Sequence, residues 1–180
     1  MTLGLRPLDP ATEAEVVHAW VTQERARFWM MQDHTLDEVR EIYQWIHDQP
    51  THAAYLVRDG DVPVGLFQTY DPRAEEVGEH FLVEPGDVGI HLLLAPPVGA
   101  EPRPGFTAEV AALVLGSVFA DPEAQRVVVE PDARNAKAVA RAERMGCTMG
   151  EVVELSTKPA RLGFLPRSAY VRVFAQDGGA

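Results

Sequence analysis

The sequence lacks several features that define large classes of proteins. It has one cysteine among 180 residues, Cys147, so an internal disulfide framework is excluded and a reducing compartment is favoured. The N-terminus has no cationic stretch followed by an apolar run, and no apolar segment approaches the length of a membrane span. We therefore expect a cytoplasmic protein with no secretory signal and no membrane partner.

Basic residues are also scarce. Lys and Arg total 16 against 27 Asp and Glu, which gives a formal net charge of -11. Such a charge repels phosphate backbones and anionic lipid surfaces, so nucleic acid is not expected as a partner. An anionic coenzyme would need local help, from backbone N–H groups at a helix end or from a nearby arginine.

Several catalytic signatures are absent. The histidines show no metal-ligand spacing with a carboxylate or thiol, and the sequence has no G-x-S-x-G, P-loop or CxxC pattern. These absences argue against a metal site, a serine hydrolase and a nucleoside triphosphatase. Cys147 has no activating base nearby in the sequence and is interpreted as a small core residue.

The length and the hydrophobic content suit one domain. With 180 residues, of which 46% are hydrophobic, the chain can bury a core of its own. We expect residues 1–180 to form a single domain, as a monomer or a homodimer. No repeat, low-complexity tract or interdomain linker interrupts it.

Hydrophobic spacing predicts a mixed α/β fold. The N-terminal third reads as helical, with helices over 12–21 and 36–47, the second framed by Thr35 and Glu38 as a capping box. Strands over 53–58 and 62–70 flank Asp59-Gly60-Asp61 and predict a hairpin. The remaining predicted elements are a strand over 87–94, a helix over 106–119, a strand over 126–130, a helix over 135–145, two strands within 148–164 and a short element of undecided type over 167–174.

A histidine within the apolar strand is the first candidate for chemistry. His91 lies among Ile90 and Leu92, and a buried imidazole needs a hydrogen-bond partner. Spacing alone favours a structural core histidine over a catalytic one. A general base becomes the better interpretation if a carboxylate from a neighbouring strand reaches the same cleft.

Asp132 is that carboxylate candidate. It lies where one strand ends and a helix is about to begin, so an ordinary turn or N-cap role is the alternative. If the two strands are parallel neighbours, His91 and Asp132 can approach one cleft as a general base and its orienting group. Asn135 could cap the following helix instead of contacting a ligand.

Two further groups of residues are candidates for binding. The segment with Arg103, Gly105, Phe106 and Thr107 opens a helix whose free N–H groups could cradle a pyrophosphate, or is simply a loop-to-helix entry. Aromatic and polar residues at element ends are candidates for a substrate pocket, although such aromatics are more often core. These pocket candidates are Phe28, Trp29, Gln68 and Tyr70.

The sequence resembles the GNAT acyltransferase superfamily, and within it the branch that acylates amine or hydroxylamine side chains in hydroxamate siderophore assembly, of the aerobactin and desferrioxamine type. The resemblance rests on blocks spread over most of the chain. They are His18 with Trp20, the Phe28-Trp29 pair, Gly65 through Tyr70, Gly89 through Leu94, Val127 through Asn135, and Lys158 before Gly163-Phe164-Leu165.

This resemblance implies a GNAT fold with splayed parallel strands flanked by helices, and His91 with Asp132 as the catalytic pair. It also implies acyl-CoA as co-substrate, acetyl-CoA or succinyl-CoA above all, and no metal. The acceptor would be an N-hydroxylated amine of the hydroxydiamine, hydroxylysine or hydroxyornithine type. The residues expected around the coenzyme are Leu92, Leu93, Leu94, Arg103, Gly105, Phe106, Thr107 and Asn135.

One departure concerns the pyrophosphate loop, which in the superfamily reads Q/R-x-x-G-x-G/A. Here Gly105 is followed by Phe106 and Thr107, so the second small residue is missing. Two alternatives stay open. One is a GNAT acetyltransferase for another amine, such as a protein N-terminus or an aminoglycoside, and the other is a catalytically silent acyl-CoA-binding domain.

Overall fold

The computed structural model describes residues 2–97 and 103–174. Part of the loop predicted before the 106–119 helix, residues 98–102, lies outside the described residues. The chain divides into two compact units, one made of Met1–Thr69 and His91–Phe106, the other of Tyr70–Ile90 and Thr107–Ala180. We call them the first and the second unit.

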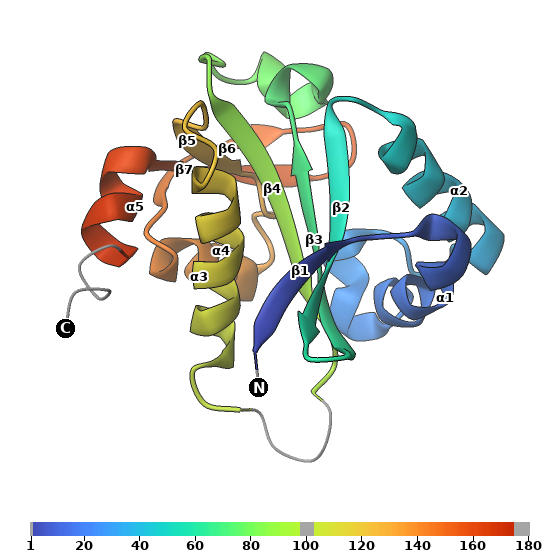
Figure 1. Ribbon diagram of the computed structural model, residues 1–180. Helices are drawn as coiled ribbons and strands as arrows, with labels where there is room; N and C mark the ends of the chain where they lie inside the picture. The colour runs from blue at the N-terminus through green and yellow to red at the C-terminus, as the bar shows by residue number, and fades with distance from the viewer. Residues whose placement is uncertain (1, 98–102, 175–180) are drawn as a thin grey trace. The chain divides into compact units, whose positions relative to one another are not determined.

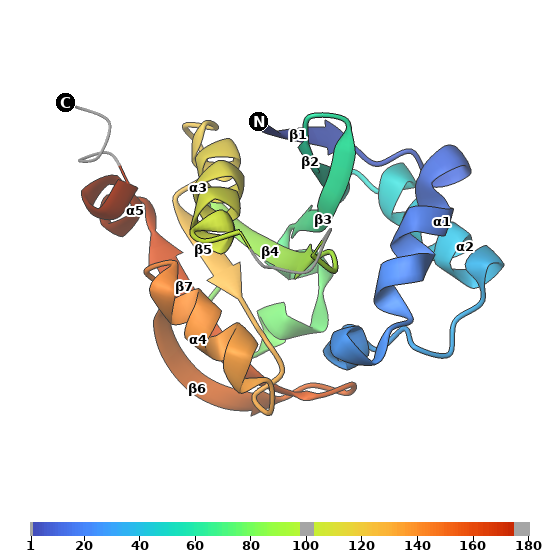
Figure 2. The same cartoon turned by 90° about the horizontal axis from the view of Figure 1, so that it is seen from below.

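The first unit combines a strand, helices and a hairpin. Its elements are β1 (Leu3–Pro7), α1 (Pro10–Val21), the 3-10 helix η1 (Glu24–Trp29), α2 (Leu36–Asp48), β2 (His52–Asp59), β3 (Val62–Tyr70) up to Thr69, and the second half of β4 (Asp87–Leu94). β1 pairs antiparallel with β2, with Leu5 opposite Val57. Figures 1 and 2 show α1 and α2 side by side in this unit.

Local signals set the helix ends of the first unit. The Asp9 side chain accepts a hydrogen bond from the Ala11 N–H and caps α1. The predicted capping box of α2 is confirmed, because the Thr35 and Glu38 side chains each accept from the other residue's backbone N–H. In the β2–β3 turn, Gly60 has φ 59°, a left-handed conformation that glycine adopts without strain.

The core of the first unit lies where α1 and α2 pack on its strands. On α2 the residues that enter this core are Val39, Tyr43 and Ile46. Burying each large side chain contributes roughly 1.5–3 kcal/mol. The buried members of this core are Leu8, Val17, Trp20, Val21, Met31, Val39, Tyr43, Ile46, Leu56 and Leu66.

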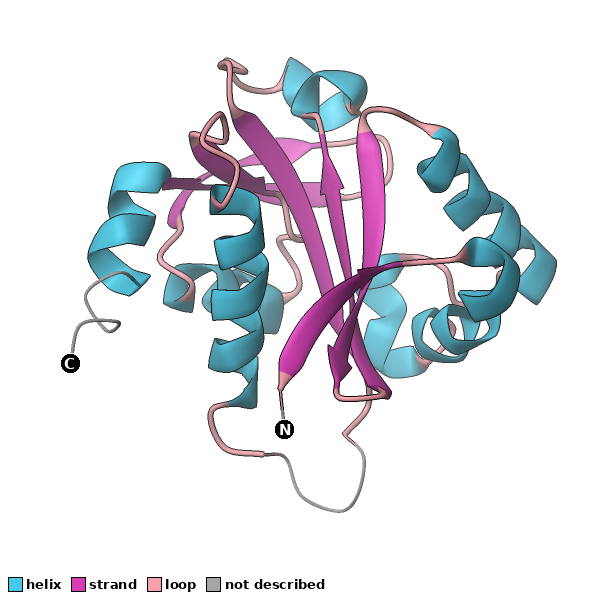
Figure 3. Ribbon diagram, viewed as in Figure 1, coloured by secondary structure: helices cyan, strands magenta, loops and turns pink. Residues whose placement is uncertain are grey.

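The second unit holds the remaining elements. They are the 3-10 helices η2 (Pro72–Ala74) and η3 (Glu76–Glu79), the first half of β4, then α3 (Phe106–Phe119) from Thr107, β5 (Arg126–Val129), α4 (Ala136–Arg144), β6 (Thr148–Glu154), β7 (Pro159–Pro166) and α5 (Arg167–Phe174). Figure 3 shows α3 and α5 as neighbouring helices, joined by stacking of Phe119 on Tyr170 at 4.6 Å between ring centroids.

The expected parallel neighbours are confirmed in the second unit. β4 pairs parallel with β5, with Val88 opposite Val127, while β7 pairs antiparallel with both β5 and β6. The strand order is β1-β2-β3-β4 in the first unit and β4-β5-β7-β6 in the second. Since β4 belongs to both, the described chain forms a mixed seven-stranded sheet with helices, and the predicted mixed α/β class is confirmed.

Three expectations about elements were incomplete or wrong. The N-terminal third is not all helical, because Leu3–Pro7 forms strand β1, whose five residues are too few for a clear alternation. The 3-10 helix η1, which carries Phe28 and Trp29, has no simple periodic signature. The undecided closing element is helix α5.

In the described part of the chain, no helix is both long and apolar enough to span a bilayer.

Candidate active site

His91 lies in the first unit, in the second half of β4, and is half-buried. Its Nδ1 is 3.2 Å from Oε1 of Gln68 on β3. The ring also meets Trp29 of η1 edge to face, with centroids 6.0 Å apart. The structure therefore brings together three residues that the sequence marked separately, one as a base and two as pocket walls.

A second hydrogen bond holds the Gln68 amide from its other end. Its Nε2 donates to the hydroxyl of Tyr43 on α2 at 3.2 Å. Burial raises the pKa of Tyr43 far above that of an ordinary phenol, and a hydrogen bond with Trp29 opposes this shift. Sequence reasoning missed Tyr43, although it stands on the same helical face as Val39 and Ile46 and is the polar member of that apolar face.

The strand segment after His91 was expected to lie around the coenzyme. The Leu94 carbonyl accepts a hydrogen bond from Arg25 at 2.8 Å, and the Ala95 N–H donates to Val64 at 2.9 Å. A Cβ on Gly65 would lie 3.0 Å from the Leu93 carbonyl oxygen, so β3 approaches this segment closely. A role for the N–H groups of Leu92, Leu93 and Leu94 in catalysis stays a prediction.

The predicted coenzyme loop also lies mainly in the first unit. Arg103 forms an ion pair with Asp59 at 3.0 Å, and its guanidinium lies over the Phe106 ring at 4.9 Å from the centroid. Gly105 has φ 78°, which explains a glycine at the entry to α3. Thr107, in the first turn of α3, belongs to the second unit. The cation expected to meet a phosphate therefore already has a carboxylate partner.

Asp132 lies in the second unit, just after β5, and is 2% exposed. Arg134 holds it with two side-chain hydrogen bonds, from Nε at 2.9 Å and from Nη2 at 2.6 Å, and with its backbone N–H at 2.9 Å. The hydrogen bonds from Arg134 hold the pKa of Asp132 below its ordinary value, and the charge of Lys158 adds to the effect. Asp132 is thus fixed as a carboxylate.

The turn after Asp132 leads into α4. The Asn135 N–H donates to the Asp132 carbonyl at 2.9 Å, and the Asn135 side chain accepts from the Ala138 N–H at 3.2 Å. The capping alternative for Asn135 is therefore confirmed. Its expected contact with the coenzyme stays a prediction.

Tyr70 is buried in the second unit against charged groups. Its hydroxyl donates to Oε1 of Glu130 at 3.1 Å, and Lys158 Nζ donates to Oε2 of the same carboxylate at 2.5 Å. Burial, followed by the charge of Glu130, raises the pKa of Tyr70 well above its ordinary value. A Cβ on Gly89 would lie only 2.1 Å from a Tyr70 ring carbon, so the absence of a side chain at Gly89 lets the ring lie there.

Sequence reasoning noted Glu130 and Lys158 only as parts of family blocks and gave them no role. Both side chains are largely buried: that of Glu130 is 6% exposed and that of Lys158 is 12% exposed. Lys158 is placed by a tight turn in which Leu155 and Lys158 exchange backbone hydrogen bonds. A signal was available, since Lys and Glu in otherwise apolar strand ends must pair when buried.

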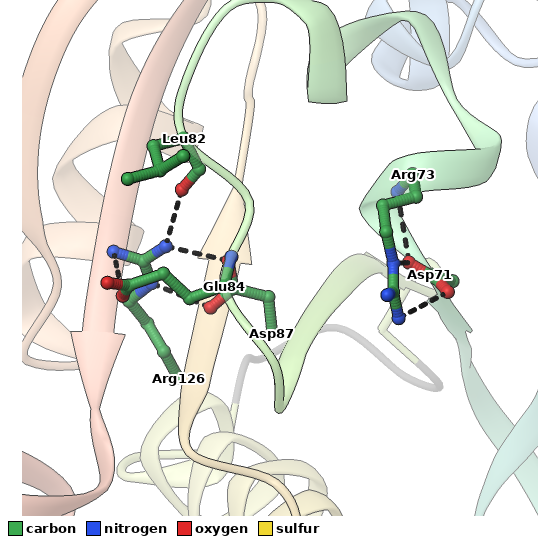
Figure 4. A network of polar contacts seen from close by, with 6 residues as sticks. All are labelled: Asp71, Arg73, Leu82, Glu84, Asp87 and Arg126. Carbon is green, nitrogen blue, oxygen red and sulfur yellow. Dashed lines mark hydrogen bonds and ion pairs between the residues drawn. The ribbon is translucent and has the colours of Figure 1, made fainter.

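A pocket role for Phe28 stays a prediction, and several charged residues of the second unit form ion pairs with one another. Phe28 in η1 is half-buried beneath the Arg27 guanidinium, 4.7 Å from its ring centroid. Figure 4 shows a clamp at the start of β4 in which Arg126 binds Asp87 through two hydrogen bonds of 2.7 and 2.6 Å. Arg126 also pairs with Glu84, and the separate Arg73–Asp71 pair in Figure 4 closes a local turn.

The structure thus groups the predicted site residues by unit. In the first unit His91, Trp29 and Gln68 meet, and Arg103 meets Phe106. In the second unit Asp132 and Asn135 share one turn. His91 and Asp132 belong to different units, so their action as a pair stays a prediction.

Known proteins similar to this chain point in one direction. Lysine N-acyltransferase MbtK of Mycobacterium sp. (strain MCS) is 26% identical over 177 residues, which cover 92% of this chain and 67% of that protein. The N(6)-hydroxylysine O-acetyltransferase of Escherichia coli is 28% identical over 147 residues, which cover 80% of this chain and 45% of that protein. The chain therefore spans about two thirds of the first relative and less than half of the second.

A solved structure agrees in fold. The aminoglycoside acetyltransferase AAC(6')-Ib in complex with coenzyme A superimposes with a TM-score of 0.82 at 23% identity, over 96% of this chain and 99% of that one. The family model described as an acetyltransferase (GNAT) domain matches residues 9–155, most of the chain. By this match, the protein belongs to the GNAT acetyltransferase family.

Proposed function

We propose that this chain is an acyl-CoA-dependent N-acyltransferase whose acceptor is an N-hydroxylated amine side chain, as in the assembly of hydroxamate siderophores. The observation that carries the activity is the His91 imidazole, half-buried on β4 and oriented by an uncharged side chain. The acceptor class is supported by relatives named for acyl transfer to lysine and hydroxylysine. Residues 1–180 would act together as one catalytic domain.

In this proposal His91 is the general base. The acceptor nitrogen bonds to the thioester carbonyl carbon, the C–S bond breaks, and the proton lost by nitrogen passes through His91 to the departing thiolate. Backbone N–H groups of Leu92, Leu93 and Leu94 would polarise the carbonyl oxygen. A hydroxylamine is largely unprotonated near neutral pH, so a neutral imidazole suffices to remove a single proton late in the reaction.

Asp132 is the second proposed catalytic residue. Arg134 keeps it ionised, which suits a carboxylate that stabilises positive charge developing on an imidazole. The Asp132→Asn variant keeps the size of the side chain and removes its charge. We expect it to lower kcat more than it raises KM for either substrate.

The loop before α3 fits a coenzyme phosphate in part. Arg103 supplies a cation, Gly105 a glycine at the helix entry, and Phe106 and Thr107 the first N–H groups of α3. Asp59 competes for the same guanidinium. Phosphate binding would therefore exchange one anionic partner of Arg103 for another.

A thiol-release assay across donors and acceptors tests the proposed function. Acetyl-CoA and succinyl-CoA would each be paired with an N-hydroxydiamine, N6-hydroxylysine, N5-hydroxyornithine, the parent amines, an aminoglycoside and a peptide N-terminus. We expect the highest kcat/KM with an N-hydroxylated acceptor. A preference for the aminoglycoside or the peptide would refute this acceptor class, and coenzyme binding without thiol release for every acceptor would indicate a silent domain.

The His91→Ala variant tests the base. General-base catalysis contributes typically 10²–10⁴-fold, so a loss of about that size in kcat is expected. The matched control is His47→Ala, which removes an exposed histidine of the same unit and should leave turnover unchanged. Normal turnover by His91→Ala would show that the base has been wrongly assigned.

A further inference from the structure

Four elements of the first unit converge on one hydrogen-bonded chain. Trp29 comes from η1, Tyr43 from α2, Gln68 from β3 and His91 from β4. The Gln68 amide stands in the middle, with Nε2 on the Tyr43 hydroxyl at 3.2 Å and Oε1 on His91 Nδ1 at 3.2 Å. The sequence marked Gln68 only as a candidate wall of a substrate pocket.

The two contacts of Gln68 depend on each other. An amide has one end that only donates and one end that only accepts, so the end that faces Tyr43 decides what faces His91. With Nε2 toward Tyr43, the carbonyl oxygen meets Nδ1 of His91. An oxygen cannot donate a proton, so Nδ1 must carry one, and in a neutral imidazole the lone pair then resides on Nε2.

The Tyr43 end of this series of hydrogen bonds is its most deeply buried part. Tyr43 is 1% exposed and belongs to the apolar core with Val39 and Ile46. The Trp29 ring packs against that core, hydrogen-bonds Tyr43, and meets His91 edge to face. The Gln68 amide is therefore anchored at its Tyr43 end by a hydroxyl held inside the core rather than one in solvent.

We propose that Gln68 is a positioning residue that fixes His91 as the Nδ1–H tautomer and presents Nε2 as the basic nitrogen, with Tyr43 holding the Gln68 amide in register. The proposal rests on the proposed function for the role of His91 as base. A neutral partner has a specific advantage here. A carboxylate in its place would favour the imidazolium, which cannot accept a proton, whereas an amide orients the ring without adding charge.

The tautomer can be measured without any turnover. Nitrogen-15 NMR of histidine-labelled protein, above the pH at which the ring is neutral, separates a protonated ring nitrogen from one that carries a lone pair. The His91 signals are assigned by their loss in His91→Gln. We expect Nδ1 protonated and Nε2 bare in the wild type, and a shift toward the tautomer mixture of free imidazole in Gln68→Leu.

Kinetics of three variants give the second readout. Gln68→Leu should lower kcat by about 10-fold or more, up to the roughly 10⁴-fold loss known for a wrong tautomer in a serine protease triad, with KM for acyl-CoA unchanged. Gln68→Glu restores an acceptor for Nδ1 and should recover part of kcat, with the acidic limb of the pH profile moved to higher pH. Tyr43→Phe should lower kcat less than Gln68→Leu.

The matched control is Tyr55→Phe, because Tyr55 stacks on Phe67 in the same unit, 5.9 Å between centroids, outside this chain of contacts. An Nε2–H tautomer in the wild type would overturn the proposal, as would a Gln68→Leu variant that raises only KM for the amine and keeps the His91 tautomer. If His91→Ala turns over normally, the proposed function has lost its base, while the NMR result still decides whether Gln68 sets the tautomer. Amide NMR spectra of each variant verify that it is folded.

Discussion

The two units hold their predicted catalytic side chains by opposite means. In the first unit, an amide holds His91, a phenol holds the amide and an indole hydrogen-bonds the phenol, and none of these partners is charged. In the second unit, the cation Arg134 holds the predicted catalytic Asp132, and Lys158 holds Glu130, which was assigned no role, in the same way. The comparison separates two tasks, because a neutral hydrogen bond chooses which nitrogen of a base is bare, while a salt bridge keeps a carboxylate charged.

The difference also predicts where stability resides. A buried ion is costly unless its partner is present, so removing one member of a buried pair should cost far more than removing one neutral hydrogen bond. Substitutions at the polar contacts of the second unit should therefore lower mainly the free energy of unfolding. Substitutions at the polar contacts of the first unit should lower mainly the catalytic rate.

The largest effect is expected at Lys158. Lys158→Met leaves the Glu130 carboxylate buried without its cation, which costs about 3–5 kcal/mol in the free energy of unfolding. Urea denaturation measures the loss, with Lys137→Met, at an exposed position of α4, as the control. The double variant Glu130→Gln/Lys158→Met should recover much of the loss, and equal instability of the single and double variants would contradict an ionic cause.

The next effect compares the two buried tyrosines directly. Tyr70→Phe removes a donor from a carboxylate and should cost about 1.5–3 kcal/mol, whereas Tyr43→Phe removes a hydrogen bond between neutral groups and should cost about 0.5–1.5 kcal/mol. Thermal and urea unfolding of both variants give the difference. A larger loss of stability for Tyr43→Phe than for Tyr70→Phe would contradict the proposed contrast between the two units.

Gly89 provides a steric test of the second unit. The added Cβ of Gly89→Ala would meet three Tyr70 ring atoms at 2.1 to 2.6 Å, and overpacking of this kind costs typically 1–3 kcal/mol. Gly150→Ala, in β6 of the same unit, is the matched control, since its Cβ would meet nothing closer than 3.7 Å. Combining Gly89→Ala with Tyr70→Leu should relieve the strain, and a purely additive double variant would show that the ring is not the cause.

The smallest effect is a pH dependence. The pKa of Asp132 is lowered in the folded protein, chiefly by Arg134, so its stabilising contribution is complete above the ordinary aspartate pKa of about 3.9 and is lost as pH falls through the folded-state value. The stability difference between wild type and Asp132→Asn should therefore shrink on acidification below about pH 4. Unfolding curves between pH 2 and pH 6 measure it. In an Arg134→Met background the folded-state pKa of Asp132 is closer to the ordinary value, so the shrinkage should be smaller.

Much of the fold could be predicted because its signals are local. The helix over 106–119 and the strands at 62–70 and 87–94 match the observed elements residue for residue, since periodicity and flanking turn residues define them. The capping box at Thr35 was likewise readable, and Gly146, with φ 93°, follows α4 in the conformation usual for a glycine at a helix C-terminus. Strand β1 and the 3-10 helix η1 were missed because short elements depend on their partners rather than on their own pattern.

The candidate site was less predictable. His91, Gln68 and Trp29 were each marked, but their mutual contact depends on three elements that are distant in sequence. Tyr43 was assigned to no site because the apolar pattern of a helix does not reveal which side chain a hydroxyl on that face will contact. Arg103 was expected to face a phosphate, and its pairing with Asp59 could not be inferred across 44 residues.

The sequence by itself determined the family and the α/β class and marked the candidates for chemistry, because residue type, spacing and local turn signals are properties of neighbours along the chain. Only the tertiary structure decided which of those residues touch. Hydrogen bonds are short and directional, so the Gln68 oxygen 3.2 Å from Nδ1 of His91 and the Arg134 guanidinium 2.6 Å from Asp132 act only because the fold places them there. Such partners follow from packing in three dimensions and not from order in the sequence.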